Sequence, residues 1–337
     1  MDNKIRIAID AMGGDGSPKK IIDGITEHNK KSKNIQYLIF GNKDVILKYI
    51  PKSLDNNCYE IIDTKNTVEG NDTPLEAAKK GKNTSMWLAI ESVKQKKADI
   101  VISAGNTGAL LVISKLNLNM IENIDKPALS ALWPNKVGMS VVLDLGANIE
   151  CNEKNLIDFS IMGSSIFKSL YPDEKAKVAL LNIGSEEMKG NELLKNTYQK
   201  MLGIQNSDFE FTGFIEGNEL MNGDVNVIVS DGFTGNVALK TAEGTANFIT
   251  NELKNAFKNN FLGKLSGLLN YFNLKKFKKR LDPRLYNGAI FIGLDSPVVK
   301  SHGATDYIGF SNSLLVCEKI VKGDLINKIK KNIYREN

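Results

Sequence analysis

The sequence predicts an α/β fold in which a mainly parallel sheet is covered by helices on both faces. Apolar runs typical of strands alternate with longer helical patterns along almost all of the 337 residues. Runs such as "ADIVIS" and "VNVIVS" are continuously apolar, as in strands that are buried on both faces. No internal repeat or linker interrupts the pattern, so we expect a single domain over residues 1–337 with one helical excursion.

The expected elements follow this alternation in order. The expected strands cover residues 4–10, 35–40, 57–62, 98–103, 139–144, 177–183, 209–215 and 225–230. The expected helices between them cover residues 17–32, 74–95, 153–170 and 190–202. Residues 247–282 lack strand signals and are expected to form a helical hairpin that leaves the α/β body.

The composition is that of an ordinary globular protein from a reducing compartment. Hydrophobic residues make up 42% and charged residues 25% of the chain, and the net charge of +5 weakly favours acidic partners. Three widely separated cysteines argue against a disulfide framework or a zinc site, and two histidines are too few for a multi-histidine metal centre. The chain enters its first strand without a signal peptide and has no membrane-spanning apolar run. We therefore expect a cytoplasmic protein without metal, cofactor or nucleic-acid partner.

Five of the expected strands end in loops with similar chemistry. These loops read "DAMGGDGS", "SAGNTGALL", "DLGANIECNE", "NIGSEEMKGNEL" and "SDGFTGNVALK". In a parallel sheet they would all emerge at the edge where doubly wound folds bind ligands, and each leads into a helix whose first N–H groups attract anions. Together the loops predict a phosphate or oxyanion site, although glycine, asparagine and aspartate are also common in ordinary turns.

No cofactor or nucleophile motif explains these loops. The first loop does not match GxGxxG, and the chain contains no GxxxxGK[ST] phosphate-binding loop. The segment "GFTGN" has the flanking glycines of a serine-hydrolase nucleophile turn but carries Thr234 in place of serine. We therefore expect neither a dinucleotide cofactor nor a hydrolase triad.

Eight segments, in this order, resemble the bacterial phosphate acyltransferases of phospholipid synthesis. The segments are "IAIDAMGGDGSP", "ISAGNTGALL", "KPAL", "LDLGAN", "IMGS", "LLNIGSEEMKGNEL", "VSDGFTGNVALKTAEG" and "VVKSHGATD". The resemblance implies a homodimer with an open, doubly wound α/β/α sandwich similar to phosphotransacetylases and isopropylmalate-type dehydrogenases. It also implies transfer of a fatty acyl group from acyl-(acyl carrier protein) to inorganic phosphate. A membrane glycerol-3-phosphate acyltransferase would then consume the acyl phosphate.

The implied reaction needs a positioned phosphate and donors for a developing oxyanion, but no metal. We predict catalytic roles for Lys189, Asp231, Asn236 and His302. We predict substrate-binding roles for Asp10, Gly13, Gly14, Asn106, Thr107, Asn148, Gly190, Asn191, Thr234, Lys240 and Lys300.

Several of these residues have a structural alternative. Lys189 can be a solvated loop lysine, and Lys240 can pair with Glu243 on the same helix. Asp10 and Asp231 can be turn-forming caps. Cys151 could accept the acyl group as a nucleophile, but the sequence offers it no evident histidine partner, so we expect direct attack of phosphate in a ternary complex.

The hairpin at residues 247–282 combines apolar residues at helical spacing with a basic run at residues 275–280. We expect a reversible contact with an anionic membrane surface through Phe261, Leu262, Leu265, Leu268 and Leu269. This contact would add to packing of the hairpin on a dimer partner, which could by itself account for the segment. Docking of the acidic carrier protein is the alternative role for the basic run. For the whole chain, a phosphotransacetylase-like acyl-CoA enzyme and a non-catalytic regulator that binds an anion or lipid metabolite remain open.

Overall fold

The computed structural model describes residues 4–204, 208–258, 265–266, 268–280 and 282–335. The first elements are β1 (Ile5–Asp10), α1 (Lys19–Lys31), β2 (Ile35–Gly41), α2 (Lys43–Leu47), the 3₁₀ turn η1 (Asn56–Cys58), β3 (Tyr59–Asp63), α3 (Pro74–Lys79), α4 (Ser85–Lys94), β4 (Ile100–Ser103) and α5 (Thr107–Asn117). They are followed by β5 (Ala128–Pro134), β6 (Met139–Leu143), α6 (Glu153–Leu170), β7 (Ala176–Asn182), α7 (Glu192–Leu202), β8 (Phe209–Glu216) and β9 (Val227–Val229). The last elements are α8 (Gly232–Lys258), α10 (Tyr271–Arg280), η2 (Pro283–Tyr286), β10 (Ala289–Ile292), β11 (Val298–Lys300), α11 (Tyr307–Lys322) and α12 (Leu325–Arg335).

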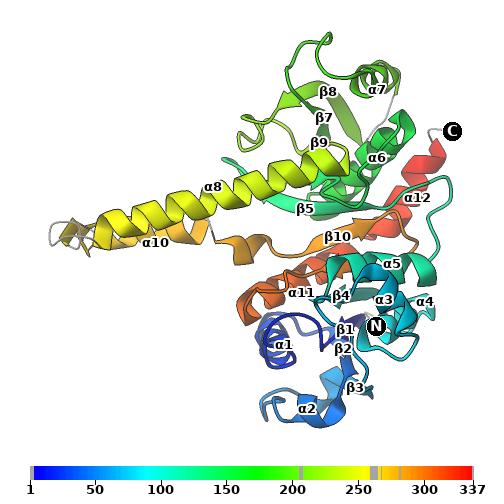
Figure 1. Cartoon of the computed structure of the whole chain (residues 1–337), viewed down its shortest axis with the longest axis vertical. Coiled ribbons are helices and arrows are strands. Elements are labelled where there is room, and N and C mark those ends of the chain that lie inside the picture. The colour runs from blue at the N-terminus through cyan, green and yellow to red at the C-terminus, as the bar shows by residue number, and fades with distance from the viewer. Residues whose placement is uncertain (1–3, 205–207, 259–264, 267, 281, 336–337) are drawn as a thin grey trace.

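One large, mainly parallel sheet runs through the molecule, as the sequence predicts (Figure 1). Its eleven strands have the order β3-β2-β1-β4-β11-β10-β5-β6-β9-β7-β8. Alternate residues of β1 show that both faces are covered: Ile7 and Ile9 belong to a core cluster with residues of α1 and α11, whereas Ala8 belongs to a cluster with residues of α4 and α5.

The sheet contains two parallel groups that run in opposite directions. Strands β3, β2, β1, β4 and β11 form the first group, and β6, β9, β7 and β8 form the second. Between them, β10 is antiparallel to both of its neighbours and β5 is antiparallel to β6. The expectation that all five loops emerge at one edge is therefore wrong, because the strands that reverse the direction were not predicted.

Capping residues explain where several helices begin. The helix expected at residues 74–95 is two helices, because Thr73 and Glu76 form a capping box that starts α3 and Thr84 accepts a hydrogen bond from the N–H of Trp87 to start α4. The predicted start of α6 is confirmed, and Asn152 caps it.

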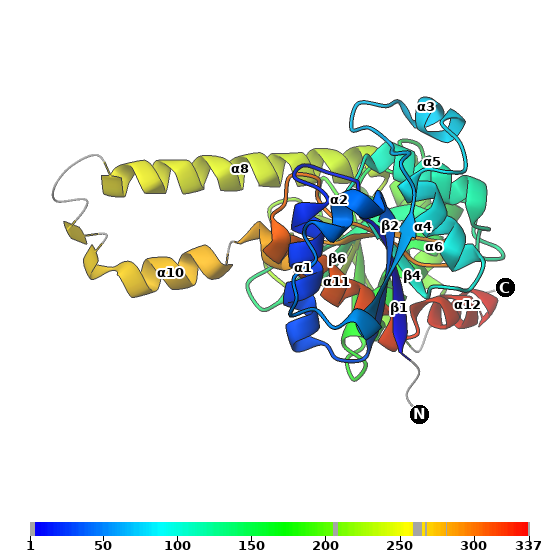
Figure 2. The ribbon, with the colours of Figure 1, turned by 90° about the horizontal axis from the view of Figure 1, so that it is seen from below.

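Helices α8 and α10 project from the rest of the molecule in the same direction (Figures 1 and 2). Helix α8 begins at Gly232, well before the expected excursion at residue 247, and only Ser230 and Asp231 separate it from β9. Most of its length, like most of α10, is exposed. Two of the predicted membrane-contact residues, Phe261 and Leu262, lie outside the described residues. None of the helices in the described part of the chain is both long and apolar enough to cross a bilayer.

Candidate active site

Asp10 lies at the end of β1 and is only 2% exposed. Its carboxylate accepts hydrogen bonds from Ser85 Oγ and Ser103 Oγ, each at 2.7 Å, and from the backbone N–H of Met12 at 3.3 Å. Burial raises the pKa of Asp10, and the two serine hydrogen bonds oppose that shift. These contacts tie the end of β1 to β4 and α4, which fits a positioning role for Asp10.

The loops that follow β1, β4 and β11 meet at Gly13 and Gly14. A Cβ atom on Gly13 would lie 2.6 Å from the backbone nitrogen of Gly105, and one on Gly14 would lie 2.7 Å from the carbonyl oxygen of Ala104. Gly14 also has a φ of +84° and lies against the carbonyl oxygen of Gly303. The two glycines therefore allow three loops to pack directly against one another, with no room for a side chain.

Two nearly buried lysines lie beside these loops. Lys300 ends β11 and is 9% exposed, and its Nζ donates to the carbonyl oxygen of Ser301. Lys20, in the first turn of α1, is 8% exposed, and its Nζ donates to the carbonyl oxygen of Gly303. Burial, and then the charge of Lys20, lower the pKa of Lys300 to about 8. Sequence reasoning missed Lys20, because a lysine at the start of an amphipathic helix gives no signal that it will be buried.

His302 lies on the loop after β11, with its side chain exposed to solvent. The backbone N–H of His302 donates to Asn287 Oδ1 at 2.9 Å, and the ring Nδ1 accepts from the N–H of Ala304 at 3.2 Å. Partial desolvation, followed by the charge of Lys300, lowers the pKa of His302, so the ring is neutral near pH 7. Because Nδ1 acts as an acceptor, we assign the proton of the neutral ring to Nε2, which makes Nε2 a donor.

Asn106 and Thr107 lie where α5 begins. Asn106 Oδ1 caps the helix by accepting from the N–H of Ala109 at 3.0 Å. The Nδ2 of Asn106 donates to the carbonyl oxygens of Gly70 and Asp72, at 3.0 and 2.9 Å. Asn106 therefore holds the segment before α3 against the start of α5, while Thr107 is exposed.

A second set of residues lies at the carboxyl ends of the other parallel group. Asp144 follows β6 and accepts from the backbone N–H groups of Leu129 at 2.9 Å and Asn148 at 2.7 Å. The side chain of Asn148 donates both to Asp144, at 2.8 Å, and to the carbonyl oxygen of Pro127, at 2.7 Å. Asn148 and Asp144 therefore shape this loop together. Asp144 was not among the predicted site residues, although its place at a strand end matches that of Asp10.

The first turns of α8 contain Thr234 and Asn236, and Asp231 directly precedes the helix. The carboxylate of Asp231 accepts from the backbone N–H of Thr234 at 2.9 Å and from Thr234 Oγ1 at 2.7 Å, so these two residues cap the helix. The side chain of Asn236 is exposed and lies against the loop after β6, where a Cβ on Gly146 would be 3.0 Å from Asn236 Nδ2.

Lys189, Gly190 and Asn191 lie between β7 and α7. The side chain of Lys189 is exposed, and we find no ion pair for it within the described ranges. Its carbonyl oxygen accepts from Asn182 Nδ2 at 3.1 Å, and Asn191 caps α7 by accepting from the N–H of Leu194 at 3.0 Å. Because β7 and β9 are adjacent and parallel, the loop with Lys189 emerges at the same edge as the start of α8.

One face of α8 connects the two sets of residues. Asn236, Lys240 and Glu243 are spaced at i, i+4 and i+7, so they lie on one side of the helix. Asn236 lies against the second set, while the charges of Lys240 and Glu243 act on the pKa of His302 in the first set. Lys240 Nζ also pairs with Glu243 at 2.8 Å on the helix surface. This is the ion pair that the sequence suggested as an alternative to a substrate-binding role for Lys240. The structure therefore brings both sets to α8 and not to a single sheet edge.

The surroundings of Cys151 do not favour a nucleophilic thiolate. Burial, and then the charge of Asp144, raise the pKa of the half-buried Cys151 thiol to about 11. The thiol is therefore protonated near pH 7, which agrees with the expectation of direct transfer.

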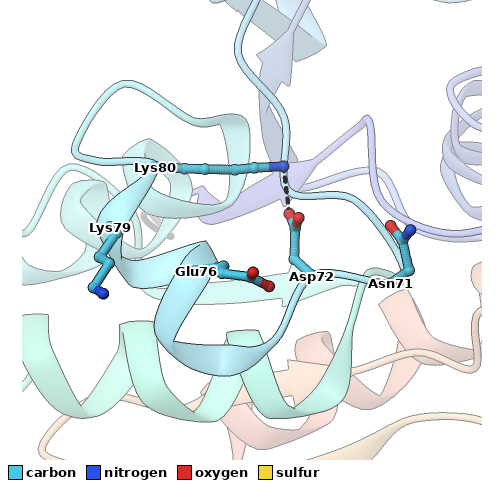
Figure 3. A pocket seen from close by; sticks show the side chains of 5 residues that line it. All are labelled: Asn71, Asp72, Glu76, Lys79 and Lys80. Atoms are coloured by element: carbon cyan, nitrogen blue, oxygen red, sulfur yellow. Dashed lines mark hydrogen bonds and ion pairs between the residues drawn. The ribbon is translucent and has the colours of Figure 1, made fainter.

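An open hollow of about 600 Å³ lies on the segment at residues 71–80 (Figure 3). It is lined by Asn71, Asp72, Glu76, Lys79 and Lys80, and Lys80 pairs with Asp72 at 2.6 Å. None of the predicted site residues lines this hollow, so we do not assign the chemistry to it. Among the residues that the structure describes, no group of three or more histidine, cysteine or acidic side chains is arranged to hold a metal ion.

Comparisons with known proteins identify the family of this chain. The model of a family described as "Fatty acid synthesis protein" matches residues 5–328. A phosphate acyltransferase of Pelagibacter ubique is 74% identical over 99% of this chain and 100% of its own length, and one of Rhodospirillum rubrum is 43% identical over 99% and 96%. A phosphotransacetylase structure from Streptococcus pyogenes has a TM-score of 0.63 at 13% identity, covering 96% of this chain and 94% of its own, which supports the fold alone. The chain therefore belongs to the phosphate acyltransferase family and is an acyltransferase enzyme.

Proposed function

We propose that this enzyme transfers a fatty acyl group from acyl-(acyl carrier protein) to inorganic phosphate, forming acyl phosphate for phospholipid synthesis. The observation that carries the proposal is the 74% identity with a phosphate acyltransferase over almost the whole chain. The exposed ammonium of Lys189, the buried ammonium of Lys300 and the Nε2–H of His302 fit a reaction whose substrate and transition state are anionic.

In the proposed reaction an oxygen of HPO₄²⁻ attacks the carbonyl carbon of the thioester. The new C–O bond forms, the C–S bond breaks, and the proton of the phosphate passes to the departing thiolate. The products are an acyl phosphate dianion and a free thiol, so atoms and charge balance. Lys189 stabilises the negative charge that develops on the carbonyl oxygen, and Asn236 orients that oxygen. Asp231 and Thr234 fix the first turn of α8, which holds Asn236 in place.

Acyl phosphate formation by the purified protein tests this proposal. We expect phosphate-dependent turnover, with a higher kcat/KM for acyl-(acyl carrier protein) than for acyl-CoA of the same chain length. A higher kcat/KM for acyl-CoA would identify acyl-CoA as the acyl donor and favour the phosphotransacetylase-like alternative. Phosphate binding without turnover on either donor would favour a binding regulator.

The proposed homodimer forms through the projecting helices α8 and α10. Phe248 on α8 and Phe272 on α10 are 67% and 76% exposed, and a large apolar surface of this kind is typical of an interface. The substitutions Phe248→Glu and Phe272→Glu together should convert a dimer into a monomer, as measured by size-exclusion chromatography with light scattering. Leu75→Glu on α3 is the control, because Leu75 is 70% exposed, and it should leave the dimer intact. If the unsubstituted protein elutes with the mass of a monomer, the proposed homodimer is refuted.

The proposed membrane contact lies at the far end of the same helices. Leu265, Leu268 and Leu269 are exposed, and Lys275 and Lys276 follow as exposed cations. Such a contact would release the labile acyl phosphate near the membrane glycerol-3-phosphate acyltransferase that consumes it.

Sedimentation with vesicles tests this contact. Binding to vesicles that contain an anionic phospholipid should weaken with salt and disappear in the double variant Leu265→Glu/Leu268→Glu, while turnover of the soluble substrates persists. Leu75→Glu again serves as the control. A double variant that binds vesicles normally would exclude these leucines as the contact. A double variant that loses only carrier-protein turnover would identify a docking surface instead.

A further inference from the structure

We propose that Lys20 and Lys300 together form the binding subsite for inorganic phosphate. The inference rests on the proposed function, because it names the residues that hold one of its two substrates. Lys20 is the new member of this subsite. It lies 280 residues before Lys300 in the chain, and the loop after β11 brings the two side chains together, because their Nζ atoms donate to the carbonyl oxygens of Gly303 and Ser301.

Both ammonium groups are buried and have fewer hydrogen-bond acceptors than N–H donors. Each side chain belongs to a residue that is more than nine-tenths buried, and each Nζ has a single acceptor, the carbonyl oxygen of Gly303 or of Ser301. An ammonium group carries three N–H donors, so two donors on each lysine lack a partner among the described residues. Neither lysine forms an ion pair with a carboxylate in that part of the chain. Burying a charge in this way destabilises a fold unless a ligand compensates it.

The charges around the pair leave the site positive. Asp10 is a buried acid whose charge attracts Lys300, but its oxygens accept from Ser85 and Ser103, and burial raises its pKa. Asp15 is exposed on the loop above and attracts Lys20 from the solvent side. The charge of Lys20 acts on Lys300, and both charges act on His302, so the cations repel one another. A dianion placed between the two lysines would remove this repulsion.

The position of the pair suits a small anion. Lys20 Nζ lies 3.0 Å from where a Cβ on Gly14 would stand; the next two residues, Asp15 and Gly16, are exposed, and a Cβ on Gly16 would meet no atom within 4 Å. The exposed ring of His302, whose Nε2–H is a donor, follows Lys300 by two residues. In the proposed subsite a free phosphate reaches both ammonium groups from this exposed side, and one of its oxygens remains available for attack on the thioester.

Lys20→Met tests the subsite, and Lys19→Met is the matched control. Methionine keeps much of the length of lysine but removes its charge. Lys19 is the adjacent residue, is exposed, and pairs with Asp23 at 2.6 Å on the helix surface. Titration calorimetry with inorganic phosphate alone should show affinity about 10- to 100-fold weaker in Lys20→Met, the size expected for losing one charge-assisted hydrogen bond. The KM for phosphate should rise by a similar factor while the KM for the acyl donor stays unchanged. Lys19→Met should behave as the parent does, and Lys20→Arg should recover part of the affinity.

The melting temperature separates a ligand group from a structural one. In phosphate-free buffer Lys20→Met should melt no lower than the parent, because it removes an uncompensated buried charge. A lower melting temperature with normal phosphate affinity would overturn the proposal, since Lys20 would then only hold the Gly303 loop. If Lys20→Met does not fold, Lys20→Gln and Lys300→Gln carry the same comparison. Phosphate affinity that depends on Lys20 in a protein without turnover would support the subsite and refute the proposed function. If Lys20→Met turns over substrate with an unchanged KM for phosphate, the subsite is refuted and the proposed function is supported.

Discussion

Gly235 offers a direct test of how the first turn of α8 is placed. A Cβ at this position would lie 2.0 Å from the carbonyl oxygen of Asp144, where carbon and oxygen atoms do not approach within 3.0 Å. In Gly235→Ala the start of α8 must therefore move by about 1 Å, and it carries Asn236 with it. A displacement of that size at a catalytic group can cost about 100-fold in rate. Overpacking of this kind also costs about 1–3 kcal/mol of folding free energy.

The assay compares kcat, both KM values and the melting temperature of Gly235→Ala with those of Gly244→Ala. Gly244 lies on the same helix, and a Cβ there would meet no atom within 4 Å. Alanine should therefore raise the stability of α8 by about 0.5–1 kcal/mol at that position without touching the site. We expect a large fall in kcat for Gly235→Ala and parental kinetics for Gly244→Ala. Parental kinetics in both variants would refute the reasoning that the position of Asn236 depends on the contact between α8 and the loop after β6.

Three further predictions concern single side chains. Lys189→Ala should lower kcat at least ~100-fold with little change in melting temperature, because an exposed lysine stabilises charge in the reaction and not the fold; normal kinetics would make it a bystander. Cys151→Ala should keep most of the activity, because burial holds the pKa of the thiol at about 11; an acyl-enzyme trapped at Cys151 and seen by mass spectrometry would contradict direct transfer. Burial also lowers the pKa of His28 from 6.5 to about 4, so between these pH values the unfolded chain binds more protons than the folded one and stability should fall as the pH drops. Urea unfolding at pH 7, 6 and 5 measures this loss, and His28→Gln should make it smaller.

The strands of the two parallel groups could be predicted because their apolar runs are long and continuous. The strands between the groups could not. β10 has four residues, too few for a pattern, and β5 contains Pro134 and a mixture of buried and half-buried positions. β11, with three residues, is the one strand of the first parallel group that was also missed. Strands β5 and β10 reverse the direction of the sheet, so the grouping of the loops depended on elements that the sequence did not reveal. The loops themselves were predicted in the right places, since strand ends rich in glycine and asparagine are visible in the sequence.

The roles of individual side chains could not be predicted where their hydrogen-bond partners are distant in the sequence. The contact between Lys20 and Gly303 joins residues 283 positions apart, and the contact between Asn106 and Asp72 joins an expected substrate ligand to a segment 34 positions away. Neither partner is visible from the residue's own neighbourhood in the sequence. The pairing of Lys240 with Glu243 was predicted as an alternative because it is local, three positions apart on one helix.

Because the two parallel groups run in opposite directions, helix α8 is the element that lies near both sets of site residues. No single edge of the sheet collects Lys300 and His302 with Lys189 and Asn236, so one element has to reach both. Helix α8 does this with Asn236 near one set and Lys240 within electrostatic reach of the other. Its start is held by close backbone contact, since a Cβ on Gly232 would lie 2.5 Å from the carbonyl oxygen of Asn148. The same uninterrupted helix continues to Lys258 in the projecting hairpin. The structure therefore carries the residues that adjoin both sets and the exposed surface of the hairpin on one continuous helix.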